Sequence, residues 1–570
     1  METSRPRYAW RDPGVALLLT VVLCGAWTLR DWHDLAALRL PDTDDMVRLQ
    51  QIRDWLAGQS FGDLAQHRLG PVPGLEMHWS RLADLVPAAW IVALTPWLGG
   101  HGAALAAVIL WPASLFCAAL ALTGAVARRL GAPPATAILL AALAYPATSL
   151  FLPGRIDHHG LQLVLILLLV RVLLGTGSFR AGAVAALAVT ASLVIGLETL
   201  PLLGVAGAAL VLLWVADRPG SRDRLLGFGF VLPIALAGAG ILFRTSGWSV
   251  PACDGFTGLL WRAVQCAAIA PMGLALFAVA GPRTARARAG AAGIAGVAAA
   301  GAVLLLAPQC LDPYGEVDPL LARLWLAEVG EAQPLFGAPP ANAIAYAGLA
   351  LAGLIASLAI ARRRREAGWW VVAALQFTAL AITLFQLRGA YAGAMLAAPA
   401  LAVTIGTARA RGPFALVAAW IAATGILYPI AATAIFPSRA AAGPSCTTPE
   451  SLARLAALPP GHLLAPLDLG AYALAATPHA VLAAPYHRNN RGNRAMYDFF
   501  LSLPAQSEAI ARAWGIDYVA FCPDDLDRFA REARDPRSLA AGLRAGSVPD
   551  WLVPIDGGDA PRTYRLASRH

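Results

Sequence analysis

The chain is poor in charged residues. Asp, Glu, Lys and Arg make up only 14% of its 570 residues, whereas 58% are hydrophobic. A soluble enzyme does not need this much apolar sequence to form its core, so the composition argues against one. It is typical of a polytopic α-helical membrane protein.

Other features are missing as well. No Cys-x-x-Cys pair and no His/Cys cluster with zinc spacing occurs, so we expect no structural zinc site. No small-residue cleavage site follows the first apolar span, Val15 to Leu29, and a short basic segment precedes it. We therefore expect an uncleaved anchor with a cytoplasmic N-terminus. The two halves show no internal symmetry, which argues against a transporter or flippase, the alternative of a different class.

The formal net charge is +9. Basic residues gather in short loops between apolar spans, as expected of cytoplasmic loops, so we interpret the charge as membrane topology and expect no nucleic-acid partner. These clusters are Arg128–Arg129, Arg218 to Arg224, Arg283 to Arg288, Arg362 to Arg365 and Arg409 to Arg411.

About thirteen apolar stretches are predicted to cross the membrane. The apolar piece Leu85 to Leu98 is too short to cross and is interrupted by Pro87 and Pro96, so we expect an interfacial or re-entrant helix there. The predicted spans are 15–29, 102–126, 134–152, 160–176, 181–197, 198–216, 224–243, 262–281, 286–308, 341–361, 367–386, 389–408 and 413–436.

Thirteen spans predict a membrane domain over 1–436 whose polar loops 30–101, 153–159 and 309–340 lie on the outer face. We call these the first, second and third loops. Residues 437–570 are then also outside, as a small α/β domain beyond a linker, Pro437 to Pro449. We expect a multi-pass protein of the inner or plasma membrane with a periplasmic or extracytoplasmic C-terminal domain. Strands are expected at 461–475, 480–486 and 516–521, and helices at 507–514 and 524–533.

The seven cysteines fall into two groups. Four lie on the predicted outer side, where disulfides are permitted, although sequence alone does not fix their connectivity. We expect the pairs Cys253–Cys310 and Cys446–Cys522. The other three lie within or beside apolar spans and are expected to be packing residues: Cys24, Cys117 and Cys266.

Acidic groups occur in all three loops. Asp42, Asp44 and Asp45 follow the first span, where charge is costly unless it faces water, a metal or a cation; a solvated acidic turn is the plain alternative. The second loop, Gly154 to Gly160, places Arg, Asp and two His at a membrane boundary, which favours a functional role. The third loop carries several acids that solvent alone could explain: Asp312, Glu316, Asp318, Glu328 and Glu331.

Carboxylate and water oxygens suit a hard cation, which in turn neutralises phosphate. Together with apolar grooves, such a site predicts Mg²⁺ or Mn²⁺ as the cofactor. It also predicts a lipid-linked phosphate donor whose tail lies among the membrane lipids.

Several motifs share an order along the chain. Asp44 lies upstream of Arg53-Asp54, Pro73-Gly74 is followed by Trp79, the second loop contains Asp157-His-His159, and the third contains Val329-Gly-Glu-Ala-Gln-Pro334. In this order the chain resembles the GT-C superfamily of membrane glycosyltransferases, most of all the catalytic subunit family of oligosaccharyltransferase. The resemblance implies about thirteen spans, an outer C-terminal domain and transfer of a sugar or oligosaccharide from a polyprenyl-(pyro)phosphate carrier. A monosaccharide transferase of the protein-mannosyl or aminoarabinose type is the alternative enzyme.

The resemblance also implies roles for particular residues. The metal ligands would be Asp44, with Asp42 or Asp45 as alternative registers, together with Asp157 and Glu331. His159 stands where the family has a second carboxylate, and Asp45 or His159 would help deprotonate the acceptor. Three residues are expected near the donor: Arg155, His158 and Arg388, the last with an interfacial snorkelling arginine as its alternative.

The acceptor is expected to differ from the family's. The family's Trp-Trp-Asp-Tyr-Gly motif falls on Pro466 to Gly470, which keeps Asp468 but lacks the paired Trp. We therefore expect a glycan, a lipid or a protein site other than an Asn-x-Ser/Thr sequon. Further candidates for sugar or phosphate binding are Trp79, Tyr486, His487 and Arg488, although 486–488 equally fit a solvated loop. Glu198 either has a function or lines a cavity.

Overall fold

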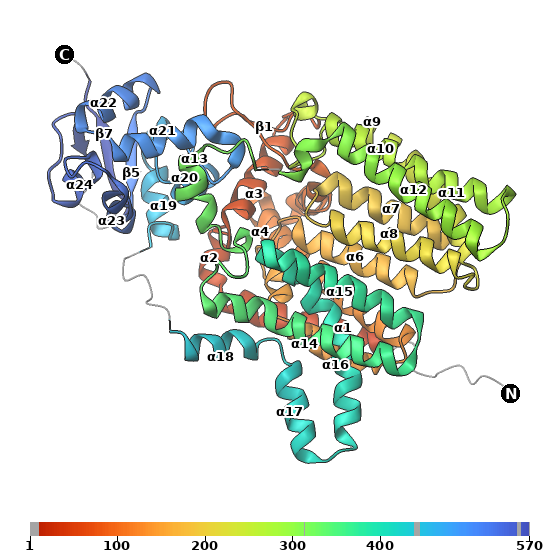
Figure 1. The fold of residues 1–570 in the computed structure, drawn as a ribbon. Helices are drawn as coiled ribbons and strands as arrows, with labels where there is room; N and C mark the ends of the chain where they lie inside the picture. Colours follow the sequence, from red (N-terminus) through yellow and green to blue (C-terminus); the bar gives the residue numbers. More distant parts are fainter. Residues whose placement is uncertain (1–10, 313, 438–444, 556–559, 569–570) are drawn as a thin grey trace.

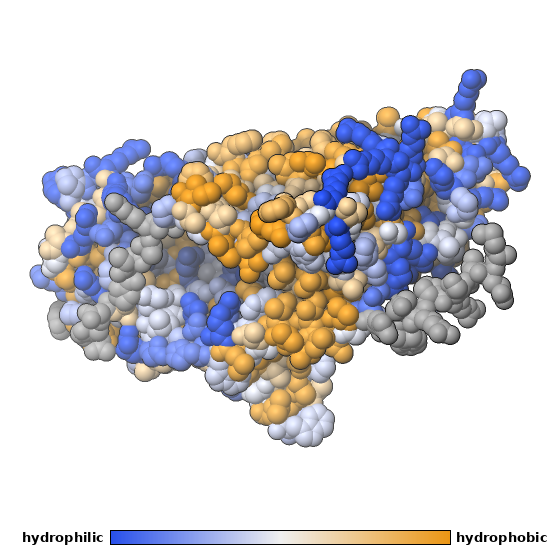
Figure 2. All heavy atoms as spheres, turned by 90° about the horizontal axis from the view of Figure 1, so that it is seen from below, coloured by the Kyte–Doolittle hydropathy of each residue, from blue (hydrophilic) through white to orange (hydrophobic). Residues whose placement is uncertain are grey.

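The computed structural model describes residues 11–312, 314–437, 445–555 and 560–568. Long helices form a bundle, and a smaller unit that contains a mixed sheet lies at one end of it (Figure 1). In a view from below, hydrophobic side chains gather over the middle of the molecule and hydrophilic ones over its two ends (Figure 2). An apolar face between polar ends is typical of a surface that a bilayer covers.

The bundle contains most of the helices. Its helices are α1 (Arg11–Arg30), α4 (Arg81–Arg129), α5 (Pro134–Ala142), α6 (His159–Leu173), α7 (Phe179–Ile195), α8 (Leu200–Val215), α9 (Ser221–Leu242), α10 (Gly258–Ala267), α11 (Ile269–Ala280), α12 (Ala285–Leu306), α14 (Pro340–Arg364), α15 (Ala367–Phe385), α16 (Ala390–Arg409), α17 (Pro413–Ala423) and α18 (Leu427–Ile435). The first loop folds into α2 (Trp32–Ala36), α3 (Thr43–Leu56) and the antiparallel pair β1 (Ala65–Gln66) and β2 (Leu75–Glu76), and the third contains α13 (Pro319–Leu324).

Eight helices of the described chain are long and apolar enough to cross a membrane, or nine if α17 and α18, bent by 84°, form one span. Helices α6, α7 and α8 are apolar but shorter. The chain is therefore a multi-pass helical membrane protein, and the count of thirteen spans stays a prediction. Leu85 to Leu98 is helical and continues into the rest of α4 across a kink at Gly99. Its position relative to a bilayer stays a prediction.

Helices α14 and α16 pack at very short range. A Cβ atom on Gly353 of α14 would lie 2.2 Å from the Cβ of Ala397, and one on Gly393 of α16 would lie 2.9 Å from the Cβ of Ala350. Small residues let membrane helices approach this closely. The contact draws α16 into the bundle and sets its N-terminal half against the middle of α14.

Replacing Gly353 by leucine should destabilise the protein, because no space exists for the side chain between α14 and α16. Overpacking of this kind costs at least about 1–3 kcal/mol, so we expect a clearly lower melting temperature in detergent. Gly207→Leu is the matched control, because no atom lies within 4 Å of a Cβ at that position. Equal melting temperatures for the two variants would contradict the close contact.

The C-terminal unit is a five-stranded sheet in the order β4-β3-β5-β7-β6, with helices around it. Strands β4, β3 and β5 are parallel, and β7 pairs antiparallel with both β5 and β6. Its elements are α19 (Pro449–Ala456), β3 (His462–Leu464), α20 (Leu467–Ala476), β4 (Ala480–Val481), α21 (Asn490–Leu501), α22 (Pro504–Ala513), β5 (Tyr518–Phe521), α23 (Pro523–Glu532), α24 (Leu539–Arg544), β6 (Leu552–Pro554) and β7 (Arg562–Leu566).

The sequence predicts this unit in part. Strands form within 480–486 and 516–521, and α22 and α23 cover the two predicted helices. The strand predicted over 461–475 is wrong beyond Leu464, because the alanine-rich segment after Pro466 forms α20. The boundary after residue 436 stays a prediction, and residues 438–444 of the expected linker lie outside the described chain.

The C-terminal sheet is joined directly to the first loop. The Val481 amide donates to the Arg68 carbonyl at 2.7 Å, and the Gly70 amide donates to the Val481 carbonyl at 2.9 Å. Leu69 thus forms a parallel bridge beside β4. Helix α20 packs against α3, and the Tyr472 hydroxyl donates to the Leu40 carbonyl at 3.0 Å. Backbone pairing and helix packing together fix this unit against the N-terminal part of the chain.

Both predicted disulfides, Cys253–Cys310 and Cys446–Cys522, are confirmed. The first ties the segment before α10 to the start of the third loop, and the second lies within the C-terminal unit. The remaining cysteines are unpaired as expected, but Cys266 is exposed on the surface of its helix rather than packed.

Candidate active site

The three clustered aspartates at the start of α3 have different partners. Asp42 caps the helix by accepting the Asp44 amide at 3.2 Å, and it also pairs with Arg155 at 2.6 Å. Asp45 is fully buried; it accepts the Asp157 amide at 2.8 Å and lies 3.1 Å from Arg155. Among the residues that the structure describes, Asp44 has no ion-pair partner. Its carboxylate is therefore the one left available.

The surroundings of Asp44 are strongly anionic. Burial raises the pKa of Asp44 well above its usual range, and the nearby charges of Asp42, Asp157 and Glu331 raise it further. Tyr486 also faces this carboxyl group, and its buried hydroxyl has no hydrogen-bond partner among the described residues. A carboxylate that has no ion-pair partner of its own and is crowded by other carboxylates favours the binding of a cation.

The second loop is held against the first by contact as well as by charge. Gly154 has a positive φ of 89°, and a Cβ atom there would lie 2.7 Å from the ring of Pro41. A side chain would therefore push the loops apart, and glycine is the residue that tolerates this backbone conformation. The contact places Asp157 beside the start of α3.

Asp157, His158 and His159 form a compact buried cluster whose possible ligand atoms lie within 4.8 Å of one another. Nδ1 of His158 lies 2.6 Å from the Asp157 carboxylate, and Nε2 of His159 lies 3.5 Å from it. Arg48 from α3 approaches the same carboxylate at 3.4 Å. Carboxylate and imidazole groups in this arrangement fit a divalent cation.

The third loop contributes Glu331. Its Oε1 lies 3.5 Å from Nε2 of His159 and 3.8 Å from Arg388, and its Oε2 accepts the Tyr391 hydroxyl at 3.1 Å. Asp318 of the same loop instead caps α13 and pairs with Arg494. The structure thus brings Asp44, Asp157, His159 and Glu331 together.

Charges compensate one another within the cluster. Burial alone raises the pKa of Asp157, but the two histidines outweigh it and hold that pKa well below its usual range. Burial lowers the pKa of His158, but Asp157 and Glu198 outweigh it and raise that pKa to about 9. Glu198 lies 3.3 Å from Nε2 of His158 and accepts the Gln162 amide at 2.9 Å. Contacts of His158 with Glu198, and of Glu198 with Gln162, therefore hold the second loop against the neighbouring helices.

A cavity lies beside this cluster; its enclosed space is about 40 Å³, and it widens into an open crevice whose total empty space, solvent included, is about 450 Å³. Its charged lining comes from His159, Glu198 and Arg388, and Nε of Arg388 is buried without a partner among the described residues. The rest of the lining is mainly apolar and comes from α6, α8, α15, α16 and η1 (Ala147–Phe151). Arg388 and His159 give this end of the cavity cationic groups beside the single Glu198 carboxylate, and together with the apolar walls they suit an anionic amphiphile. The apolar lining includes Leu150, Leu163, Ile166, Leu202 and Ile382.

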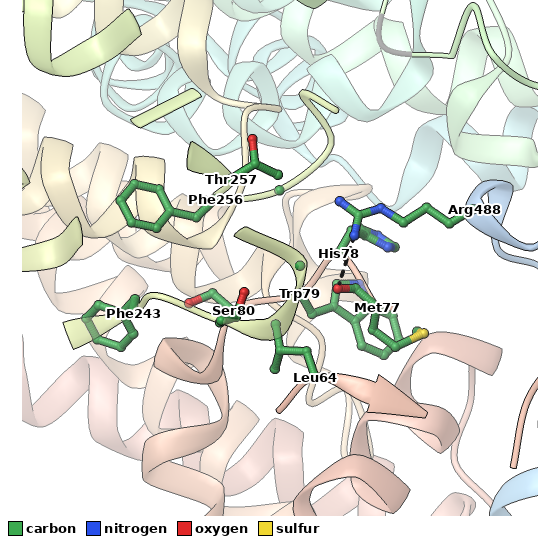
Figure 3. A pocket seen from close by; sticks show the side chains of 12 residues that line it. Leu64, Met77, His78, Trp79, Ser80, Phe243, Phe256, Thr257 and Arg488 are labelled. Atoms are coloured by element: carbon green, nitrogen blue, oxygen red, sulfur yellow. Dashed lines mark hydrogen bonds between the residues drawn. The ribbon is translucent and has the colours of Figure 1, made fainter. Parts of the chain in front are cut away.

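Other predicted binding residues already have protein partners. Trp79 is only 3% exposed and lies under the Arg48 guanidinium, 4.6 Å from ring centroid to Cζ. His487 and Arg488 both bind Asp254, which precedes α10. Figure 3 shows Arg488 reaching a narrow crevice where it donates to the Met77 carbonyl. These contacts join the C-terminal unit to the bundle.

Asp468 is exposed at the start of α20 and makes none of the cluster's contacts. Sequence reasoning missed Arg48, Asp254 and Tyr391. Of these, Tyr391 had a usable signal, because it follows Arg388 by three residues at the start of a helix and so shares its face.

Comparisons with known proteins gave structural matches only. No family model and no curated protein sequence matches the chain. A structure of the oligosaccharyltransferase AglB from Archaeoglobus fulgidus with an inhibitory peptide and a dolichol-phosphate aligns with TM-score 0.65 and 14% identity, over 94% of this chain and 72% of that one. The same enzyme with Zn and sulfate gives TM-score 0.61 and 15% identity, over 93% and 70%.

The A. fulgidus enzyme tethered to an acceptor peptide with the NVT sequon gives TM-score 0.66 and 13% identity, over 99% of this chain and 74% of that one. These alignments extend over almost the whole described chain. The expected oligosaccharyltransferase-like fold is therefore confirmed.

Proposed function

We propose that this protein is a metal-dependent glycosyltransferase. It moves a sugar or oligosaccharide from a polyprenyl-(pyro)phosphate carrier to an acceptor at the outer face of the membrane. The observation that carries this proposal is the unpaired Asp44 carboxylate, crowded by Asp157 and Glu331, beside a cavity with a cationic end and apolar walls. The shared fold with oligosaccharyltransferases supports it.

The residues present fit a divalent cation. Asp44, Asp157 and Glu331 would hold it, and Mg²⁺ or Mn²⁺ accepts such a set of carboxylates. When bound, the cation supplies Lewis-acid stabilisation of the charge on the departing phosphate. A structure of the A. fulgidus enzyme contains Zn and sulfate, which supports a metal site in this fold.

The donor would lie in the cavity beside the cluster. Arg388 has a buried Nε–H without a partner among the described residues, and this group would donate to a phosphate oxygen. The polyprenyl chain would run along the apolar residues of α6 and α8, where Leu163 and Leu202 line the cavity. The dolichol-phosphate in an A. fulgidus AglB structure supports a donor of this class.

Asp45 has a positioning role in this scheme. Both of its oxygens are engaged, one by the Asp157 amide and one by Arg155, so it holds the second loop in place. His159 is then the group that takes the proton from the acceptor. The acceptor is a glycan, a lipid or a protein site other than a sequon, because Leu467 and Leu469 flank Asp468 in place of aromatic residues.

The proposal is tested with the purified full-length protein in detergent. Polyprenyl-phosphate and polyprenyl-pyrophosphate sugars are supplied separately with Mn²⁺ and a glycan, lipid or protein acceptor, and release of the lipid carrier and glycosylation of the acceptor are followed by mass spectrometry. We expect release with one donor, its loss on adding EDTA and its recovery with excess Mn²⁺. Release that continues undiminished in EDTA would refute metal dependence. Movement of the lipid across vesicles without any release would favour a flippase.

A further inference from the structure

We infer that Tyr391 is a positioning residue that fixes Glu331 in the orientation needed to bind the cation. This inference rests on the proposed metal site. The Tyr391 hydroxyl donates to Oε2 of Glu331 at 3.1 Å, and the Tyr391 ring lies 6.3 Å from that of His159. The Tyr391 side chain is only 8% exposed and lies in the lining of the cavity beside the cluster.

Glu331 needs such support because of where it lies. It belongs to a short 3₁₀ turn, η5 (Gly330–Ala332), in the third loop and not to a membrane helix. Its Oε1 faces His159 and Arg388, whereas Tyr391 is the hydrogen-bond partner of Oε2 within the described chain. Without the Tyr391 hydroxyl, only the longer contacts of Oε1 with His159 and Arg388 restrain the carboxylate, so its direction is less well fixed.

Tyr391 is itself held rigidly. Its ring lies 6.1 Å from that of Tyr346 on α14, and the ring of Tyr346 lies 5.8 Å from that of Tyr145, edge to face. Aromatic pairs at such distances favour defined orientations. The close approach of α14 and α16 at Gly353 and Gly393 brings the first pair together. The three tyrosine rings thus pack in a row that ends at Tyr391, the hydrogen-bond partner of Glu331.

The inference predicts a specific defect in Tyr391→Phe. Residues that orient a metal ligand typically contribute about 10- to 100-fold to metal affinity. We expect the dissociation constant for Mn²⁺, titrated by electron paramagnetic resonance on the full-length protein, to rise by about that factor. Activity should recover in part at high Mn²⁺. The matched control is Tyr428→Phe, which removes a hydroxyl bonded to the Ala422 carbonyl and should leave Mn²⁺ affinity unchanged.

A double-mutant cycle separates positioning from a general structural effect. Glu331→Gln alone should weaken Mn²⁺ binding, and adding Tyr391→Phe should weaken it no further, because the hydroxyl then has no carboxylate to orient. Unchanged affinity in Tyr391→Phe, or fully additive losses, would overturn the inference while leaving the metal site standing. Unchanged affinity in Glu331→Gln would refute the metal site itself, and the inference with it.

Discussion

Asp44→Asn should abolish sugar transfer without lowering the melting temperature of the metal-free protein. Asp44 has no ion-pair partner among the described residues, and its carboxylate faces those of Asp157 and Glu331, so neutralising it relieves repulsion. The same change removes a proposed metal ligand. We expect at least about a 10³-fold loss of activity, corresponding to roughly 4 kcal/mol of transition-state stabilisation.

Thermal denaturation with and without Mn²⁺ tests whether the Asp44→Asn variant has lost metal binding. A ligand that binds the folded state raises its stability, so the wild-type protein should melt higher with Mn²⁺, whereas Asp44→Asn should show no such rise. Asp45→Asn is the matched comparison one residue away. It weakens the buried pair with Arg155 and should lower the melting temperature even in EDTA. An active Asp44→Asn variant would show that another aspartate is the ligand.

Arg388→Met should raise the KM for the lipid-linked donor and reduce kcat/KM by about 100-fold, which corresponds to roughly 2.7 kcal/mol for a lost charged hydrogen bond. The reason is that Arg388 is the cationic group in the wall of the cavity and has an unused Nε–H. Arg388→Lys keeps the charge but not the planar geometry, so it should recover only part of the loss. Steady-state kinetics over a range of concentrations of a synthetic donor measure KM and kcat/KM for both variants.

The control for Arg388 is Arg494→Met. Arg494 is 43% exposed at its side chain and pairs with Asp318 and Asp498, an arrangement that contributes about 0–1 kcal/mol. Its loss should leave donor KM within a factor of two. If both variants impair donor use equally, Arg388 acts only through the general positive charge of this face.

Much of the fold follows from charge and hydropathy along the chain. The three loops that the charge pattern places on one side do come together, and the four cysteines expected on that side form both predicted disulfides. The C-terminal unit was harder to predict. Gly461 to Ala475 has apolar residues that fit a strand or a helix, and only the position of Pro466 separates β3 from α20.

The sequence indicated which kinds of residue form the site, but not which of the three aspartates is left without an ion-pair partner. Asp42, Asp44 and Asp45 are chemically alike, and their distinct environments arise from Arg155, more than a hundred residues later. The spacing of Tyr391 groups it with Arg388, but its role could not be assigned from the sequence, because an aromatic residue at a helix start usually packs in a core. Its contact with Glu331 depends on tertiary packing that no local pattern encodes.

The contacts between the first loop and the C-terminal unit can form only late in the synthesis of the chain. Leu40 and Tyr472, which hold the same junction, are separated by 432 positions in the chain. Contacts of such sequence separation form late, because the intervening chain must first be made and inserted. Helix α3 carries Asp44 and gains its partner α20 only at that stage. A nascent or truncated chain that lacks α20 would therefore lack the assembled candidate site.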